Sequence, residues 1–130
     1  MKKIIFSVLQ YLYKQKVVKR VSDYTEPLKV NGYSTVTDKT ILGKNVNFNG
    51  MKIGGCGKVT IGDNFHSGRE CLMITQNHNY NGKKIPYDST YICKDIEIED
   101  NVWIGDRVII LGGGDNRRRN NYTSRKCCSE

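Results

Sequence analysis

The chain has 130 residues, enough for one domain, and its 38% hydrophobic residues and 13 glycines favour a fold that turns often and buries little per residue. Its formal net charge of +8 lies at the ends: residues 1–20 carry six Lys/Arg and no acid, residues 115–130 have a net charge of +3, and the body holds 10 basic and 11 acidic residues. Nucleic-acid binding needs a clustered basic face, so the nearly neutral body argues against a nucleic-acid partner.

Residues 1–22 predict an amphipathic helix, because apolar residues recur there at helical spacing. A charged start before an apolar run is also typical of signal peptides, but Gln10 and Lys14 interrupt the run and no small-residue cleavage site follows. Two interpretations are open: a helix packed on its own domain or on a partner subunit, or an interfacial helix in peripheral contact with anionic lipid. The apolar residues are Ile5, Val8, Leu9 and Leu12.

A six-residue repeat begins at Ile98 and reads I-E-D-N-V-W, I-G-D-R-V-I and I-L-G-G, with Ile104 and Ile110 opening the second and third units. Upstream copies start at Leu42 and Ile61. In such a repeat each unit is a short strand and a corner, and three units make a triangular coil whose first aliphatic residue points inward. We therefore predict an all-β fold, a parallel β-helix of stacked coils over residues 23–113.

Two segments interrupt the repeat. Ile53-Gly54 and Ile61-Gly62 are eight residues apart, and the extra residues around Gly55 are typical of a bulge or a distorted corner. Residues 75–95 lack the repeat altogether, so we expect a loop that leaves the β-helix there.

Residues 114–130 lose the repeat and form a basic tail, which a disordered end would also explain. Codons compatible with residues 114–129, read one nucleotide later, encode V-T-I-G-E-G-x-x-I-Q-A-G-S-V-V-V, which is again repeat sequence. Its inward residues would replace Asn116, Tyr122 and Cys128, in step with Ile110. We therefore expect an aberrant, frameshifted and truncated C-terminus, produced by one extra nucleotide in the glycine codons at 112–114.

The five cysteines are odd in number and include no C-x-x-C pair, and the chain has only two histidines. Neither pattern matches metal-ligand spacing, so no metal site is expected. Cys56, Cys71 and Cys93 are expected to remain reduced, as small apolar residues of a cytoplasmic protein.

The N-H-x-x-x-G segment at 77–82, followed by I-P-Y and then D-N-V-W-I-G, resembles the hexapeptide-repeat acyltransferases. The nearest members are the maltose, galactoside, xenobiotic and polysaccharide O-acetyltransferases, and the resemblance runs from Leu42 to Gly113. It implies left-handed winding, a homotrimer, and transfer of acetyl from acetyl-CoA to a sugar hydroxyl in cell-surface polysaccharide biosynthesis. A small antibiotic or serine is the alternative acceptor, and an inactive remnant is the alternative to an enzyme, because later coils that hold CoA are missing or scrambled.

The resemblance also assigns residues. His78 would be the general base, since a neutral imidazole can take a hydroxyl proton near pH 7 as the oxygen attacks the thioester. Contacts with CoA or the acceptor would come from Asn77, Tyr80, Asn101 and Trp103. Alternatively, Trp103 covers the outer face of a coil, and Tyr80, Tyr87 and Tyr91 cover the edge of the β-helix. His66 is expected to be a structural corner residue.

Overall fold

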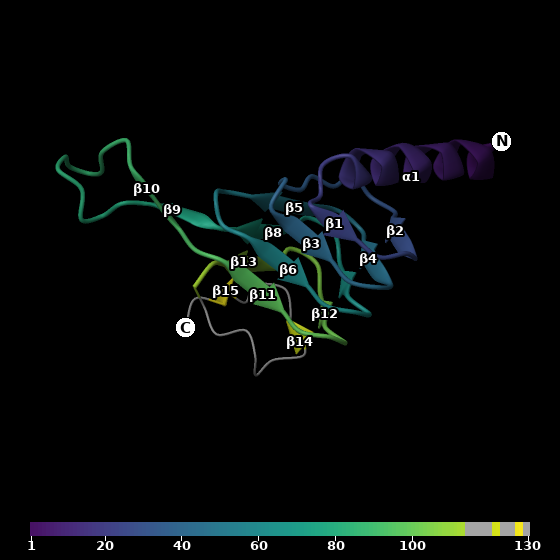
Figure 1. Ribbon diagram of the computed structural model, residues 1–130. Helices are drawn as coiled ribbons and strands as arrows, with labels where there is room; N and C mark the ends of the chain where they lie inside the picture. The colour runs from purple at the N-terminus through teal and green to yellow at the C-terminus, as the bar shows by residue number, and fades with distance from the viewer. Residues whose placement is uncertain (114–120, 123–126, 129–130) are drawn as a thin grey trace.

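Three parallel sheets form the body of the protein in a computed structural model that describes residues 1–113, 121–122 and 127–128 (Figure 1). The first sheet contains β1 (Asp23–Tyr24), β3 (Thr40–Leu42), β6 (Val59–Ile61) and β11 (Ile96–Ile98). The second contains β2 (Leu28–Val30), β4 (Val46–Phe48), β7 (His66–Ser67), β12 (Trp103–Ile104) and β14 (Asn121–Tyr122). The third contains β5 (Met51–Gly54), β8 (Cys71–Ile74), β13 (Ile109–Leu111) and β15 (Cys127–Cys128).

The chain contributes one strand to each of the three sheets and so completes a coil. Each strand of the next coil then pairs with the equivalent strand of the coil before it. Ile98, Ile104 and Ile110 lie in β11, β12 and β13, one on each sheet, and all three are buried. Each new strand is parallel to the strand one coil earlier, as in the pairing of Ile98 with Ile61. The predicted three-sided parallel β-helix is therefore confirmed.

The interior is a column of apolar side chains that the strands turn inward at alternate positions. Phe48 and Phe65, from successive coils, meet edge to face with ring centroids 6.0 Å apart. Burying a side chain of this size contributes about 1.5–3 kcal/mol, so the stacked coils stabilise one another although no single coil has a core of its own.

One corner of the β-helix is a ladder of asparagines. Asn45, Asn64 and Asn101 adopt left-handed φ angles of 60°, 58° and 62°, which asparagine tolerates better than most residues. The side-chain amide of Asn45 donates to Asn64 at 3.0 Å, and that of Asn64 donates to Asn101 at 2.9 Å. Asn101, predicted from resemblance to contact substrate, thus has a structural role at this corner.

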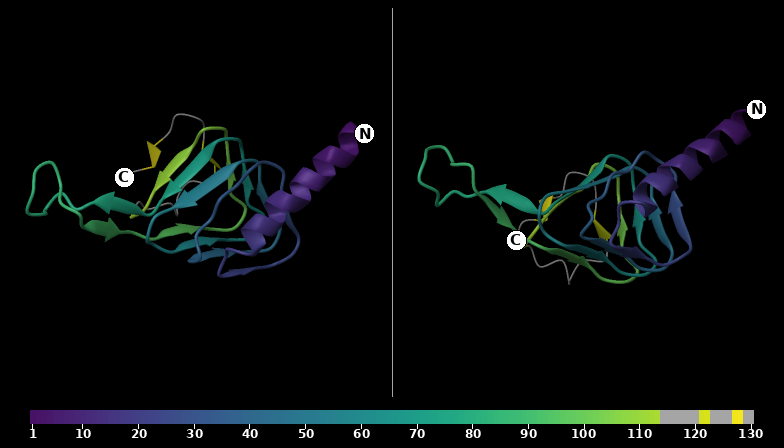
Figure 2. Two further views of the ribbon diagram at one scale, coloured as in Figure 1. Left: turned by 90° about the horizontal axis from the view of Figure 1, so that it is seen from above. Right: turned by 45° about the horizontal axis from the view of Figure 1, so that its top comes forward.

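The helix α1 (Lys2–Val18) precedes the first coil. Its last turns pack on the β-helix through Val17, which is fully buried, and through Tyr13 and Val18. Its first turns are exposed and extend beyond the coils (Figure 2). Among the described residues, no helix has the length and hydrophobicity needed to cross a bilayer.

Two short strands continue the coils past Gly113. Tyr122 in β14 pairs with Ile104, and Cys128 in β15 pairs with Ile110. This backbone register agrees with the inward positions expected for Tyr122 and Cys128, whereas Asn116 lies outside the described residues. The frameshift itself stays a prediction, because register does not reveal codons.

Candidate functional site

A β-hairpin leaves the β-helix between the third and the first sheet, within the predicted loop 75–95 (Figure 1). It consists of β9 (Gln76–His78) and β10 (Tyr91–Cys93), paired antiparallel with His78 opposite Tyr91. In a coil without the insertion, the equivalent corner residues Lys44 and Asp63 are 19 positions apart. In the coil that contains it, Asp63 and Asp100 are 37 positions apart. In every view the hairpin points away from the coils, on the side opposite the N-terminal end of α1 (Figure 2).

His78 lies exposed at the end of β9, in contact with two tyrosine rings. Its ring stacks on Tyr87 with centroids 3.6 Å apart and an interplanar angle of 16°. Tyr91 lies 4.9 Å away at 32°. Stacking with Tyr87 covers one face of the imidazole and leaves its nitrogens, which lie in the ring plane, accessible at the edge. The arrangement orients the ring and leaves its edge free for a substrate.

Hydrogen bonds order the tip of the hairpin. The Asn79 backbone N–H donates to Thr90 at 3.1 Å, and the Asn79 side-chain oxygen accepts from the Asn81 N–H at 3.0 Å. Asp88 accepts from the hydroxyl and the backbone N–H of Thr90 and from the Lys83 N–H. These donors, the Thr90 hydroxyl foremost, hold the pKa of Asp88 below its usual value. The tip is thereby defined although it is exposed.

The base of the hairpin is fastened to the glycine-rich corner. Thr75 is fully buried; its hydroxyl donates to the Gly54 carbonyl at 2.9 Å and accepts from the Gly57 N–H at 3.0 Å. Gly55 has φ +109°, and a Cβ there would lie 2.4 Å from the Thr75 hydroxyl oxygen. The corner is therefore distorted, as expected, and its glycine leaves room for Thr75 at the base of the hairpin. A disulfide joins Cys56 to Cys93 at the same place.

The expectation that Cys56 and Cys93 are reduced is therefore wrong. The hairpin returns Cys93 to the corner that holds Cys56, with a Cα–Cα distance of 5.4 Å, although 37 residues separate them in sequence. Cys71 is free and buried, as expected. Burial raises the pKa of its thiol, which argues against a nucleophilic role.

A groove of about 850 Å³ lies on the other side of the molecule, between α1 and the outer face of the second sheet. Trp103 is half exposed on β12, where it is the cross-strand neighbour of His66 on β7. Both residues form part of the wall of the groove. Its lining comprises Phe6, Asn31, Gly32, Asn49, His66, Gly68, Arg69, Trp103, Gly105 and Asp106.

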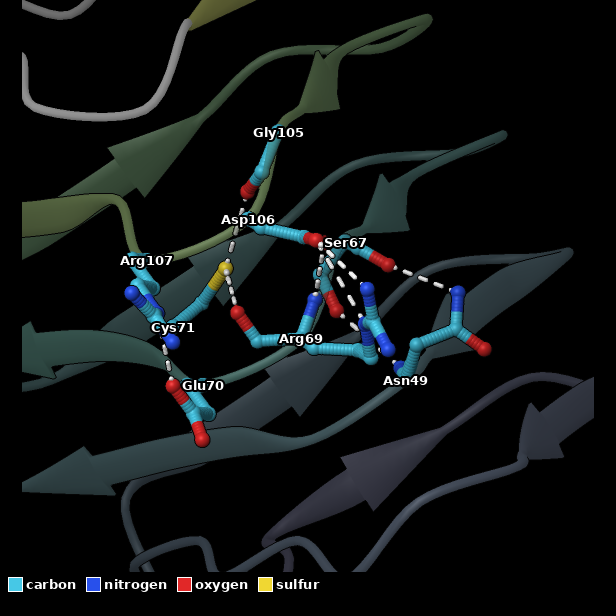
Figure 3. Close-up of polar contacts among 8 residues, drawn as sticks. All are labelled: Asn49, Ser67, Arg69, Glu70, Cys71, Gly105, Asp106 and Arg107. Carbon is cyan, nitrogen blue, oxygen red and sulfur yellow. Dashed lines mark hydrogen bonds and ion pairs between the residues drawn. The ribbon is translucent and has the colours of Figure 1, made fainter.

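Polar contacts fix one wall of this groove (Figure 3). The Asn49 side-chain amide donates to the Ser67 carbonyl at 2.8 Å and to His66 Nε2 at 3.1 Å. Asp106 accepts from the Arg69 backbone N–H at 2.7 Å and pairs with its guanidinium at 3.2 Å. The backbone donor and the guanidinium keep the pKa of Asp106 below its usual value. The groove therefore offers a ligand the half-exposed indole of Trp103 and a guanidinium that already pairs with Asp106.

The predicted site residues do not gather at one place within one chain. Asn77, His78 and Tyr80 are exposed on the hairpin, Trp103 lies in the groove and Asn101 at a corner. His66, expected to be a structural corner residue, lies on the strand β7, where it lines the groove and bonds to the Asn49 side chain. It occupies the outward position equivalent to that of Trp103, a likeness that the long insertion between them hides in the sequence. Within the described residues, no three His, Cys, Asp or Glu side chains cluster closely enough to hold a metal ion.

Comparisons with known proteins give a likeness in fold. No protein-family profile matches the chain, and no curated protein matches its sequence. Among solved structures, a point mutant of AntD, an N-acyltransferase from Bacillus cereus in complex with dTDP and coenzyme A, is similar with a TM-score of 0.57. The two sequences are 13% identical over 90% of this chain and 76% of that chain, so the similarity shows a shared fold.

Proposed function

We propose that this chain is a CoA-dependent O-acetyltransferase that moves an acetyl group from acetyl-CoA to a sugar hydroxyl, in cell-surface polysaccharide biosynthesis. The observation that carries the proposal is the exposed His78 imidazole, which contacts two tyrosine rings on a hairpin fastened to a rigid β-helix. Reactive groups commonly sit on loops that a rigid scaffold positions. The shared fold with an N-acyltransferase that binds coenzyme A supports the reaction class, and we expect the winding to be left-handed.

In the proposed reaction, His78 accepts the proton of the acceptor hydroxyl while the oxygen attacks the thioester carbonyl carbon. The resulting tetrahedral oxyanion collapses, the carbon–sulfur bond breaks, and the imidazolium returns its proton to the CoA thiolate. No covalent bond to the enzyme forms, so no nucleophilic cysteine or serine is required. Asn77 and Tyr80, which flank His78 on the exposed hairpin, are proposed to contact the acceptor.

We further propose that the site forms between subunits of a homotrimer. The hairpin points away from its own coils, and Trp103 lies in the groove on the other side. A neighbouring chain could therefore present its groove to His78, with Trp103 and the adjoining Asn101 corner along the path of acetyl-CoA. The proposed location is the cytoplasm, at the inner face of the membrane.

An inactive remnant is the second candidate, favoured by the tail, whose composition departs from the repeat after Gly113. A CoA-thiol release assay separates the two candidates when it is run on this chain and on a version that carries the frame-restored repeat in place of residues 114–130. The acceptors would be sugars, serine and a hydroxyl-bearing antibiotic, and mass spectrometry would identify the product.

We expect O-acetylated sugar from both versions, at a lower rate from this chain. Product from the frame-restored chain alone would favour the inactive remnant. Equal turnover by both would eliminate the remnant, and preferred turnover of serine or the antibiotic would replace the sugar as acceptor. If neither version releases CoA with any acceptor, the enzyme assignment fails.

A further inference from the structure

The first three turns of α1 present an apolar face to solvent. The residues of α1 that approach the β-helix are spaced three and four apart, as Gln10, Tyr13 and Val17. The opposite face carries an apolar stripe that nothing in the described chain covers. It consists of Ile4, Ile5, Val8 and Leu12, exposed by 68%, 57%, 51% and 54%.

The helix that carries this stripe is strongly basic. Residues 1–20 contain six Lys/Arg and no acid, and in the described part of the chain only Lys14 among them pairs with a carboxylate, Glu26, at 2.8 Å. Lys2 and Lys3 also lie in the first turn, where the helix dipole disfavours positive charge, and neither a side-chain cap nor an acidic residue compensates them. A partner that combines an apolar region with negative charge would therefore bury the stripe and neutralise the basic residues.

We propose that α1 is an interfacial helix that docks on an anionic lipid surface, with Ile4, Ile5, Val8 and Leu12 inserted among the acyl chains and the basic residues at the headgroups. An apolar stripe flanked by Lys and Arg is the pattern of helices that lie in the membrane interface. The long stems of Lys2, Lys3 and Lys19 allow their ammonium groups to reach headgroups beside an inserted stripe.

A second copy of this chain fits the same face less well. The stripe spans residues 4–12, little more than one heptad, whereas coiled coils are sustained over about three to four heptads. Helices of two or three copies would also bring their basic residues together without acids to compensate them. An anionic bilayer neutralises this charge.

The helix is positioned for such docking. Val17, Tyr13 and the Lys14–Glu26 pair fix its last turns to the first coil, so its direction relative to the β-helix is set. The exposed turns extend past the coils, on the side opposite the hairpin that carries His78 (Figure 2). Docking through the stripe therefore leaves the hairpin directed away from the exposed end of α1.

Cosedimentation with vesicles tests the proposal on the full chain. The vesicles are phosphatidylcholine alone and phosphatidylcholine mixed with phosphatidylglycerol. We expect about tenfold or more stronger binding to the mixed vesicles, weakened by added salt. Val8→Asp should abolish this binding, whereas Ile85→Asp, which puts the same charge on a fully exposed isoleucine of the hairpin, should leave it intact.

A charge-matched pair completes the test. Lys2→Gln/Lys3→Gln/Lys19→Gln should weaken binding by about tenfold or more, and Lys29→Gln/Lys52→Gln/Lys58→Gln, on the coils, should change it by less than about threefold. Equal binding to both vesicle types, or binding that survives Val8→Asp, overturns the proposal. The proposal also fails if the unmodified chain does not bind vesicles and Val8→Asp forms a smaller assembly in sedimentation velocity. That result would show that the stripe packs against a second copy of the chain.

Discussion

Tyr87 determines the orientation of the proposed base. Its ring lies 3.6 Å from that of His78, nearly parallel, and no other ring approaches as closely within the described residues. His78 is exposed, so without this contact its side chain would sample several rotamers. A base that samples several rotamers meets the acceptor proton in the productive geometry less often, which lowers the rate.

Tyr87→Ala should lower kcat about tenfold, because an aromatic stack contributes about 0.5–1.5 kcal/mol and a tenfold change in rate corresponds to about 1.4 kcal/mol. Tyr87→Phe keeps the ring and should restore most of the activity. Steady-state kinetics would measure kcat and KM separately, and thermal melting should be unchanged in both variants. A Tyr87→Phe variant as slow as Tyr87→Ala would contradict the stacking role and point to the hydroxyl.

Single residues were predictable to the extent that their surroundings follow from the repeat. Ile98 and Ile104 are inward because the six-residue period repeats their environment in every coil. Cys56 and Cys93 were not predictable in the same way, because their pairing depends on where an inserted hairpin returns. The place of His66 on a strand was missed for a related reason, since its neighbour Trp103 lies one coil and one insertion away.

At the scale of elements, the hairpin is a separate unit fastened at its base. Thr75 contributes hydrogen bonds to Gly54 and Gly57, and the Cys56–Cys93 disulfide closes a loop of 37 residues. Cross-linking a loop of this length stabilises the fold by about 2–4 kcal/mol, chiefly by restricting the unfolded chain. Disulfides are uncommon in the cytosol, so this bond stands against the proposed cytoplasmic location.

Cys56→Ser/Cys93→Ser should lower the free energy of unfolding by about 2–4 kcal/mol and speed amide exchange in residues 76–93. Chemical denaturation and hydrogen exchange would measure the two effects. A reductant should reproduce both in the unmodified chain and add nothing to the double variant. Equal exchange in the oxidised and reduced chains would show that Thr75 holds the hairpin without the bond.

The extent of the elements was partly predictable. The strands from Ile98 onward and the interruption at 75–95 follow from the presence and the loss of the repeat. The antiparallel pairing within that interruption was not foreseen, because β9 and β10 are three residues each and polar side chains dominate the segment between them. Their pairing depends on the anchored base and on Asp88 at the tip, which are tertiary features.

At the scale of the whole molecule, the coils place two candidate ligand-contacting regions on different sides. The hairpin with His78 points away from the coils, whereas Trp103 lines the groove beside α1, so we propose that the two regions meet between chains. The three-sided β-helix was predictable from the sequence, since a six-residue repeat specifies stacked triangular coils. The sequence left the direction of α1 open, because a stripe of apolar residues does not reveal whether its partner is protein or lipid.

The central claim is that His78 is the base of an acyl transfer. The chain has two histidines, so the most direct test compares the activity of an alanine variant of each. In the CoA-thiol release assay on the frame-restored chain, His78→Ala should lower kcat by about 10²- to 10⁴-fold, the usual contribution of general-base catalysis. His66→Ala, in the groove, should change kcat by less than about tenfold and act mainly on KM. Turnover that survives His78→Ala, or that is lost with His66→Ala in its place, would contradict the account.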